Sequence, residues 1–130
     1  MRPFVKIILN DKVLNAVIDT GAMHSYIRSE FTKDCLRVPV QPLKIELGGK
    51  SLYFKEAVLI SGEICDSKGK KYQFSELFFE VENLGTEKDK KIDAIIGAIL
   101  QEKWGVVINN SVKPPEVDFY LLRKGEITEL

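Results

Sequence analysis

The residues best suited to chemistry in this chain lie in one stretch, NAVIDTGAMHSYI, at residues 15–27. Asp19 directly follows the apolar pair Val17-Ile18, and Thr20 and Gly21 come directly after it. A carboxylate at the end of an apolar strand is costly unless neighbouring groups donate hydrogen bonds to it. Gly21 lets the following turn come close enough to donate from its backbone, and the Thr20 hydroxyl can both donate and accept.

The chemistry open to Asp19 depends on whether a second carboxylate faces it. Two facing carboxylates cannot both ionise cheaply, so they share a proton, and one serves as base while the other serves as acid. Such a pair can activate a water molecule and protonate a leaving amine. Hydrolysis of a peptide bond needs both steps. The alternative is that Asp19 is an ordinary hydrogen-bonded turn residue.

Composition excludes several classes of protein. The chain has 130 residues, of which 45% are hydrophobic and 29% charged, as expected for a single globular domain spanning residues 1–130. Its 19 basic and 19 acidic side chains cancel, so charge gives no support to a nucleic-acid or membrane partner. The basic cluster at Lys88, Lys90 and Lys91 is interpreted as a solvated loop.

Histidine and cysteine usage argues against a metal site. His24 is the one histidine in the sequence, and Cys35 and Cys65 lack the spacing of metal ligands. The favoured interpretation is two reduced thiols in a cytoplasmic protein, with a single disulfide as the alternative. No apolar run is long enough to span a membrane, and polar residues interrupt the apolar N-terminus too early for a signal peptide.

The pattern of apolar residues predicts a mainly β domain, barrel-like or sandwich-like, with one late helix. Residues 4–9 and 12–19 flank the turn Asn10-Asp11, which predicts a hairpin. The other expected elements, in chain order, are a short helix or turn at 28–36, a hairpin of 43–47 and 51–64 around Gly48-Gly49, a strand at 71–82, a charged loop at 82–91, an apolar strand at 92–97, a helix at 98–104, a strand at 105–109 and a last hairpin at 117–130.

Two segments together resemble the signatures of the aspartic proteases. VIDTGAMHSYI resembles the catalytic motif of that family, with Ser25 at the expected offset, and DAIIGAILQEKWGVVIN resembles its second signature. The resemblance covers residues 4–109. It implies a retropepsin-like β-barrel, closed or partly open, in which residues 95–97 pack behind Asp19 and the helix 98–104 follows.

The chain carries one Asp-Thr-Gly, which resembles the single-lobed, retroviral-type branch of the family. The resemblance then implies a homodimer in which each chain supplies one aspartate, acting on a peptide or protein substrate without metal or cofactor. Thr20 would bond to the partner, and Gly48-Gly49 would form a mobile flap, the alternative being a plain hairpin turn. The implied catalytic residues are Asp19, Thr20 and Gly21, and the implied substrate-binding residues are Ala22, Met23, Gly48, Gly49 and Ile96.

Two positions differ from the retroviral pattern. Met23 and Ala98 stand where retroviral enzymes carry an acidic residue and an arginine that pair with each other. Both partners are replaced together, so neither leaves an unpaired charge. This difference, with the longer C-terminal tail, implies a different dimer contact. It also keeps two alternatives open: a peptide-binding or dimerisation module with little turnover, and a monomer with an incomplete site.

Overall fold

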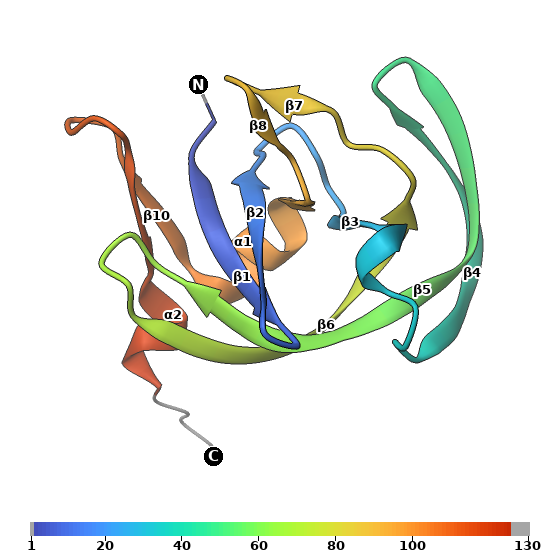
Figure 1. The fold of residues 1–130 in the computed structure, drawn as a ribbon, viewed down its shortest axis with the longest axis horizontal. Coiled ribbons are helices and arrows are strands. Elements are labelled where there is room, and N and C mark those ends of the chain that lie inside the picture. Colours follow the sequence, from blue (N-terminus) through green and yellow to red (C-terminus); the bar gives the residue numbers. More distant parts are fainter. Residues whose placement is uncertain (1, 126–130) are drawn as a thin grey trace.

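The first hairpin forms where the sequence predicts it. The computed structural model describes residues 2–125 (Figure 1). In it, β1 (Phe4–Leu9) pairs antiparallel with β2 (Lys12–Ile18). Asn10 and Asp11, which join the two strands, have φ of 49° and 67°. A two-residue turn with both φ positive matches the twist of the flanking strands and fixes their register. That register decides which residues lie beside Asp19.

Six strands close into a barrel, which confirms the predicted mainly β fold. The ring runs β1-β2-β9-β3-β6-β5 and closes by pairing of β5 with β1 (Figure 1). Among the strands of residues 2–125, β4 pairs only with β5 and lies outside the ring. The remaining strands of this sheet are β3 (Tyr26–Arg28), β4 (Arg37–Leu47), β5 (Lys50–Cys65), β6 (Lys71–Val81) and β9 (Ala94–Ile96).

Short elements connect and cover the barrel. The segment 28–36 forms a 3₁₀ turn, η1 (Ser29–Phe31), and the helix predicted at 98–104 is present as α1 (Ala98–Trp104). The charged loop at 82–91 contains a small hairpin of β7 (Thr86–Glu87) and β8 (Lys90–Lys91). Gly105, with φ of 64°, ends α1 in the left-handed conformation that favours glycine.

Alternation along the strands separates two apolar clusters. On β9, Ala94 and Ile96 face the main core, whereas Ile95 joins a second cluster with Val17 of β2. Strands whose two faces are both buried read as continuous apolar runs, which explains the sequence of β9 and of the last three residues of β2, 16–18. The main core also holds Leu100 and Trp104 of α1, so the helix closes the barrel interior. The second cluster extends to the β4–β5 hairpin.

The last hairpin predicted from the sequence is wrong over its described part. β11 (Glu116–Phe119) pairs with β10 (Val106–Asn109), and the chain then forms the helix α2 (Tyr120–Lys124). The β11 strand therefore has a partner from earlier in the chain. Residues 120–124 include leucine, arginine and lysine, which favour a helix. The rest of that prediction, at 126–130, falls outside the described residues.

No helix within residues 2–125 is long and apolar enough to cross a membrane. Cys35 and Cys65 are both half-buried and free. Burial raises the pKa of both thiols above the ordinary value, so they are protonated at neutral pH and weakly nucleophilic. The interpretation of two reduced thiols agrees with this arrangement.

Candidate functional site

The backbone of Asp19 is held by the strand that crosses behind it. β2 and β9 are parallel, with Ile18 opposite Ile96. The Asp19 amide donates to the Ile96 carbonyl at 3.1 Å, and the Gln101 side chain donates to the carbonyls of both Asp19 and Ile96, at 2.9 and 2.8 Å. The predicted packing of residues 95–97 behind Asp19 is thus present. These contacts fix the backbone of Asp19, and with it the point from which the side chain extends.

Each oxygen of the Asp19 carboxylate has a different partner. The Gly21 amide donates to Oδ1 at 2.9 Å, which is the backbone hydrogen bond predicted for this turn. A Cβ on residue 21 would lie 3.3 Å from the same oxygen, so glycine allows the close approach. Arg2 Nη1 donates to Oδ2 at 2.9 Å. The Asp19 side chain remains 21% exposed, so solvent reaches the carboxylate.

Gly97 is where the strand β9 passes through the Asp19 loop. A Cβ at this position would lie 2.0 Å from the His24 carbonyl oxygen, so only glycine fits. The Gly97 amide donates to Ser25 Oγ at 2.9 Å, and Ser25 is buried. Ser25 therefore acts as a buried structural hydroxyl, as interpreted from the sequence.

The first two backbone amides of α1 donate hydrogen bonds to the same loop. Ala98 donates to the Ala22 carbonyl at 2.7 Å, and Ile99 donates to the Met23 carbonyl at 3.1 Å. The Met23 side chain is 65% exposed. Met23 and Ala98, the positions that differ from the retroviral pattern, are thus neighbours, joined through the backbone of the loop and the helix.

Arg2 is a site residue that the sequence reasoning missed. Besides Asp19, its guanidinium contacts Oε1 of Glu87, with both Nε and Nη2 at 2.8 Å. Burial opposes the charge of Arg2, but hydrogen bonds and the negative charges of Glu87 and Asp19 hold its pKa above the ordinary value. A signal was present in the sequence. The Asn10-Asp11 turn pairs Phe4 with Val17, and this register continues to place residue 2 opposite residue 19.

Glu87 is held on one oxygen only. Its Oε2 atom is buried and has no hydrogen-bond partner within the described residues. Buried carboxylate oxygens normally have partners, because desolvation without a hydrogen bond is costly. The Arg2 guanidinium is therefore shared between Asp19 and a carboxylate that has capacity to accept more.

A cavity of about 510 Å³ lies between Asp19 and the β4–β5 turn. Gly48, Leu47 and Lys50 line it from the turn, and Asp19 and Arg2 line it from the other side. Gly48 and Gly49 have φ of 57° and 80°, and no atom lies near either α-carbon where a side chain would stand. Side chains of the second apolar cluster form part of its wall: Leu52, Val81, Leu84 and Ile95.

The other predicted site residues are distributed as follows. Thr20 and Gly21 are exposed beside Asp19, whereas Ala22 is half-buried and packs on the second apolar cluster. Gly49 and Met23 are exposed but do not line the cavity.

Ile96 is not positioned to contact a ligand in this cavity. Its side chain has no exposed surface and belongs to the main core. Ile95, one residue earlier, lines the cavity in its place. Successive side chains of a strand point to opposite faces, so an assignment that is off by one residue places the side chain on the wrong face. The residue of β9 that lines the cavity is therefore Ile95 and not the predicted Ile96.

In the part of the chain from residue 2 to residue 125, no three His, Cys, Asp or Glu side chains gather to hold a metal ion. Comparisons of the sequence with protein-family models and with curated proteins find no match. Function must therefore be argued from the geometry of the site.

Proposed function

We propose that the protein is a homodimeric aspartic endopeptidase of the retroviral type. In this proposal, a water molecule held between two Asp19 carboxylates, one from each chain, attacks the peptide bond. The observation that carries the proposal is the position of Asp19: β9 and Gly97 cross behind it, while its carboxylate faces a cavity bounded by the Gly48 turn. A side chain with only a structural role in a turn needs neither the crossing nor the cavity.

The second carboxylate is proposed to come from a second copy of the chain. Glu82 is the other acid that lines the cavity, but it is exposed and makes no hydrogen bond to the Asp19 loop. Thr20 is exposed next to Asp19, and within the described residues its hydroxyl has no hydrogen-bond partner. An isologous contact around a two-fold axis lets the same residue of both chains meet at the axis.

The proposed reaction uses the shared proton of the pair. The ionised carboxylate takes a proton from water as the water oxygen attacks the carbonyl carbon, and the protonated carboxylate donates to the carbonyl oxygen. The resulting tetrahedral diol then collapses and the C–N bond breaks. The carboxylate that took the proton from water donates it to the amine nitrogen, and the other carboxylate accepts a proton from a diol hydroxyl, which restores the starting pair. The net change is addition of one water across the amide, with no covalent intermediate. Gly48 and Gly49 would close over the bound peptide as a flap.

Arg2 sets a condition on this mechanism. Its guanidinium occupies Oδ2 of Asp19 at 2.9 Å, and Oδ1 is held by Gly21. A carboxylate that is to bind a water molecule and share a proton with its counterpart needs one oxygen available. Arg2 must therefore move away from Oδ2 in the active dimer, and Glu87 is a second acceptor already in contact with it.

Substitution of Asp19 tests the proposal. The protein is incubated with a mixture of denatured proteins from acid to neutral pH, and new N-termini are identified by mass spectrometry. We expect Asp19→Asn to abolish cleavage with the fold retained, and a statine-type transition-state mimic to inhibit the unchanged protein. The matched control is Asp34→Asn, at an exposed aspartate that does not line the cavity. Cleavage by Asp19→Asn at the original rate would refute the proposal.

The second candidate is a peptide-binding module with the same fold and little turnover. The Arg2–Asp19 ion pair favours it, because it leaves the carboxylate already neutralised within one chain. The same incubation separates the two. Retention of peptides in stoichiometric amounts without new N-termini would support the module, whereas cleavage that depends on Asp19 would support the enzyme.

A further inference from the structure

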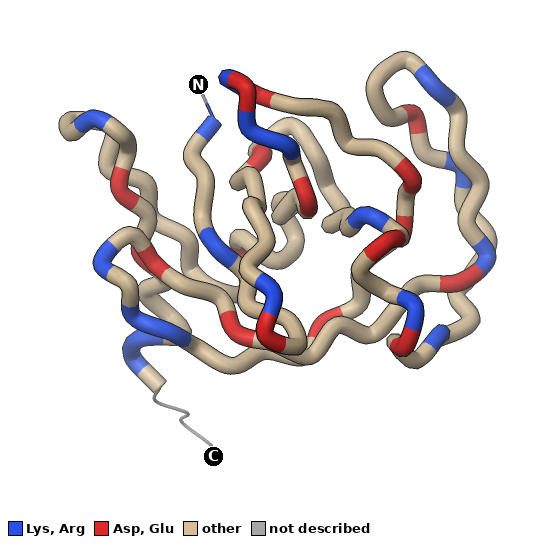
Figure 2. The backbone as a smooth tube through the Cα atoms, viewed as in Figure 1, with Lys and Arg blue, Asp and Glu red and all other residues tan. Residues whose placement is uncertain are grey.

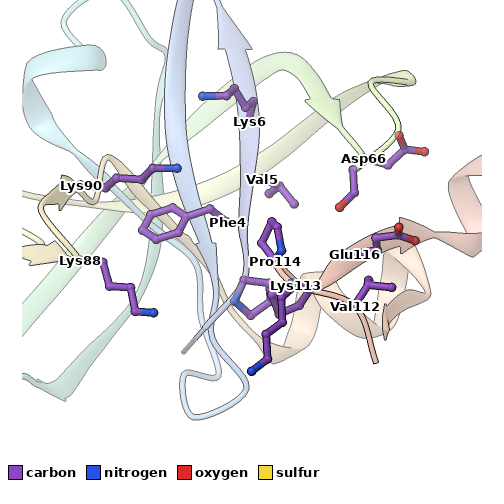
Figure 3. A pocket seen from close by; sticks show the side chains of 13 residues that line it. Phe4, Val5, Lys6, Asp66, Lys88, Lys90, Val112, Lys113, Pro114 and Glu116 are labelled. Carbon is purple, nitrogen blue, oxygen red and sulfur yellow. The ribbon is translucent and has the colours of Figure 1, made fainter. Parts of the chain in front are cut away.

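A second cavity is separate from the one that Asp19 lines. It has a volume of about 580 Å³, within the range of sites that bind ligands. Four segments that are distant in the sequence line it: the start of β1, the β5–β6 turn, the β7–β8 hairpin and the loop before β11 (Figure 3). None of the residues assigned above to substrate binding or catalysis lies in it.

The cavity combines an apolar centre with a basic margin. Figure 3 shows Phe4, Val5 and Pro114 in the middle of the view, with lysine side chains around them. Lys90 Nζ lies 5.2 Å from the centre of the Phe4 ring, a cation–π contact. The four lysines that line the cavity are Lys6, Lys88, Lys90 and Lys113.

Two of these lysine side chains have no partner in the part of the chain that the structure describes. Neither Lys88 nor Lys113 has a hydrogen bond or ion pair within the described residues. Two acids also line the cavity, Asp66 and Glu116, and Asp66 Oδ1 already accepts from the amides of Lys68 and Lys70. Four positive charges against two negative ones give the cavity a surplus of positive charge in a chain whose net charge is zero. An occupant that complements it is acidic and carries apolar groups.

The two cavities are neighbours along the chain. Arg2 lines the Asp19 cavity, and the next residue, Pro3, lines the basic one. On the other side, Glu87 contacts Arg2, while Lys88 lines the basic cavity. Adjacent residues of the same two segments, 2–3 and 87–88, thus serve the Asp19 side and the basic cavity.

We propose that the cavity between the start of β1, the β7–β8 hairpin and residues 112–116 binds an acidic, partly apolar segment of the polypeptide substrate, outside the residues that flank the bond to be cut. The inference rests on the proposed endopeptidase function for its biological meaning, but binding itself does not depend on cleavage. Such a site selects substrates by a segment remote from the reacting bond and raises the local concentration of that bond at Asp19.

Peptide binding to the Asp19→Asn variant tests the inference, since this variant does not consume the probe. The probe is a short fluorescein-labelled peptide of alternating Glu and Leu, followed by fluorescence anisotropy. We expect binding that weakens as salt is added, and that falls about tenfold when Lys88→Glu and Lys113→Glu are introduced together, because each change replaces an attraction with a repulsion. A peptide with Gln in place of Glu should bind more weakly to the parent.

The matched control reverses two exposed lysines that line neither cavity, with Lys33→Glu and Lys55→Glu. Equal loss of binding in this control would show that the overall charge of the protein, and not the cavity, determines binding, and would overturn the inference. If Lys88→Glu with Lys113→Glu destabilises the fold, the pair Lys88→Gln and Lys113→Gln replaces it. Absence of binding to the parent also overturns the inference.

Sedimentation of the same variants tests whether a second copy of the chain occupies the cavity instead. If the parent binds no acidic peptide and charge reversal at Lys88 and Lys113 converts a dimer to a monomer, the cavity is an interface between copies. Failure here is distinguishable from failure of the proposed function. Cleavage that depends on Asp19 without peptide binding defeats only this inference, whereas binding without cleavage defeats only the enzyme.

Discussion

At the scale of single residues, the two oxygens of Asp19 are in different situations. Oδ1 accepts a hydrogen bond from the Gly21 amide. This bond lies within the turn, so the formation of a dimer need not break it. Oδ2 receives Arg2, whose guanidinium is also bound to Glu87. The backbone bond orients the carboxylate, whereas the arginine occupies the oxygen that the proposed mechanism needs. The balance of Arg2 between its two carboxylates is therefore expected to control turnover.

Substitutions of Arg2 and Glu87 are expected to act in opposite directions. Arg2→Ala vacates Oδ2 and should raise kcat/KM about fivefold, the equivalent of one partly exposed ion pair of about 1 kcal/mol. Glu87→Gln removes the competing carboxylate, leaves Arg2 on Asp19 and should lower kcat/KM by a similar factor. Arg2→Lys keeps a cation near Oδ2 and serves as the control. Cleavage of one peptide is measured for all variants, with melting temperatures to compare their stability.

The opposite signs separate this interpretation from a structural one. If Arg2 served only to tie the N-terminal segment to β7, both substitutions would reduce activity and stability together. A lower rate in Arg2→Ala, with an unchanged melting temperature, would instead show that Arg2 assists the reaction.

At the scale of elements, the site depends on the passage of β9 through the Asp19 loop. Gly97 lies so close to the carbonyls of His24 and Met23 that a methyl group has no space, since the obstructing atoms are backbone. Ser25 and Gln101 add hydrogen bonds on either side of the crossing. The strand β9, the Asp19 loop and α1 therefore form one structural unit. A substitution that disturbs the passage of β9 should also displace Asp19.

Two substitutions of graded severity test this unit. Gly97→Ala should cost about 3 kcal/mol or more of unfolding free energy, because backbone must move to admit the methyl group. Ser25→Ala leaves the buried Gly97 amide without an acceptor and should cost about 1–3 kcal/mol. Urea denaturation measures both. The exposed hydroxyl next to Asp19 supplies the control, since Thr20→Ala should leave the stability of the separate chain nearly unchanged.

A polar cluster of Glu80, Arg37 and Thr32 joins β6 to β4 and should make the stability of the fold depend on pH. Glu80 accepts hydrogen bonds from Arg37, with Nη2 to Oε2 at 3.1 Å, and from Thr32. Its bond to Arg37, then the bond to Thr32, hold the pKa of Glu80 below its ordinary value of 4.5 despite partial burial. The ionised form is thus the one that stabilises the fold. This contribution is complete above the ordinary pKa and is lost as pH falls through the lower, folded value.

Glu80→Gln should therefore be less stable than the unchanged protein at neutral pH. As pH falls below the ordinary value, the unchanged protein should lose more stability than the variant, so that the two curves converge in acid. Melting temperatures measured from neutral pH down through this range check the expectation. Parallel curves would show that the carboxylate contributes nothing specific at this position.

The sequence predicted those elements whose signals are local. The Asn10-Asp11 and Gly48-Gly49 turns lie between apolar runs, and the Gly97–Gly105 segment carries both ends of α1, so these elements form where expected. The last hairpin failed because β11 pairs with β10, a contact that no local pattern encodes. The exchange of Ile95 for Ile96 came from the two-residue period of a strand that is buried on both faces.

The contacts of Arg2 were missed for a different reason. A single arginine before a strand has no periodic signal, and its relation to Asp19 appears only when the register of the first hairpin is followed to its end. The relation to Glu87 needs the fold, since the two residues are brought together by tertiary structure. Sequence patterns therefore located the aspartate but not the charges around it.

At the scale of the whole molecule, the chain by itself presents half of the proposed site. Asp19 and the β4–β5 turn bound one cavity, and one Asp-Thr-Gly is present in the sequence. Figure 2 shows basic and acidic residues interspersed along the backbone, and the net charge is zero. Two copies can thus approach without the mutual repulsion that a large net charge produces. Activity should accordingly belong to the pair.

Mixing two forms of the chain tests this dependence directly. If each active unit needs one Asp19 from each chain, an equimolar mixture with Asp19→Asn should retain about half the activity of the same amount of unchanged protein, the value for random pairing. A larger excess of the variant should suppress activity further, because nearly every intact chain is then paired with an inactive one. The Asp34→Asn variant, added in the same amounts, should not suppress activity. Specific activity should also rise with protein concentration until pairing is complete. Activity that stays proportional to the intact chains at every ratio, and independent of dilution, would place the whole reaction within one chain and leave Asp19 without the counterpart that its chemistry requires.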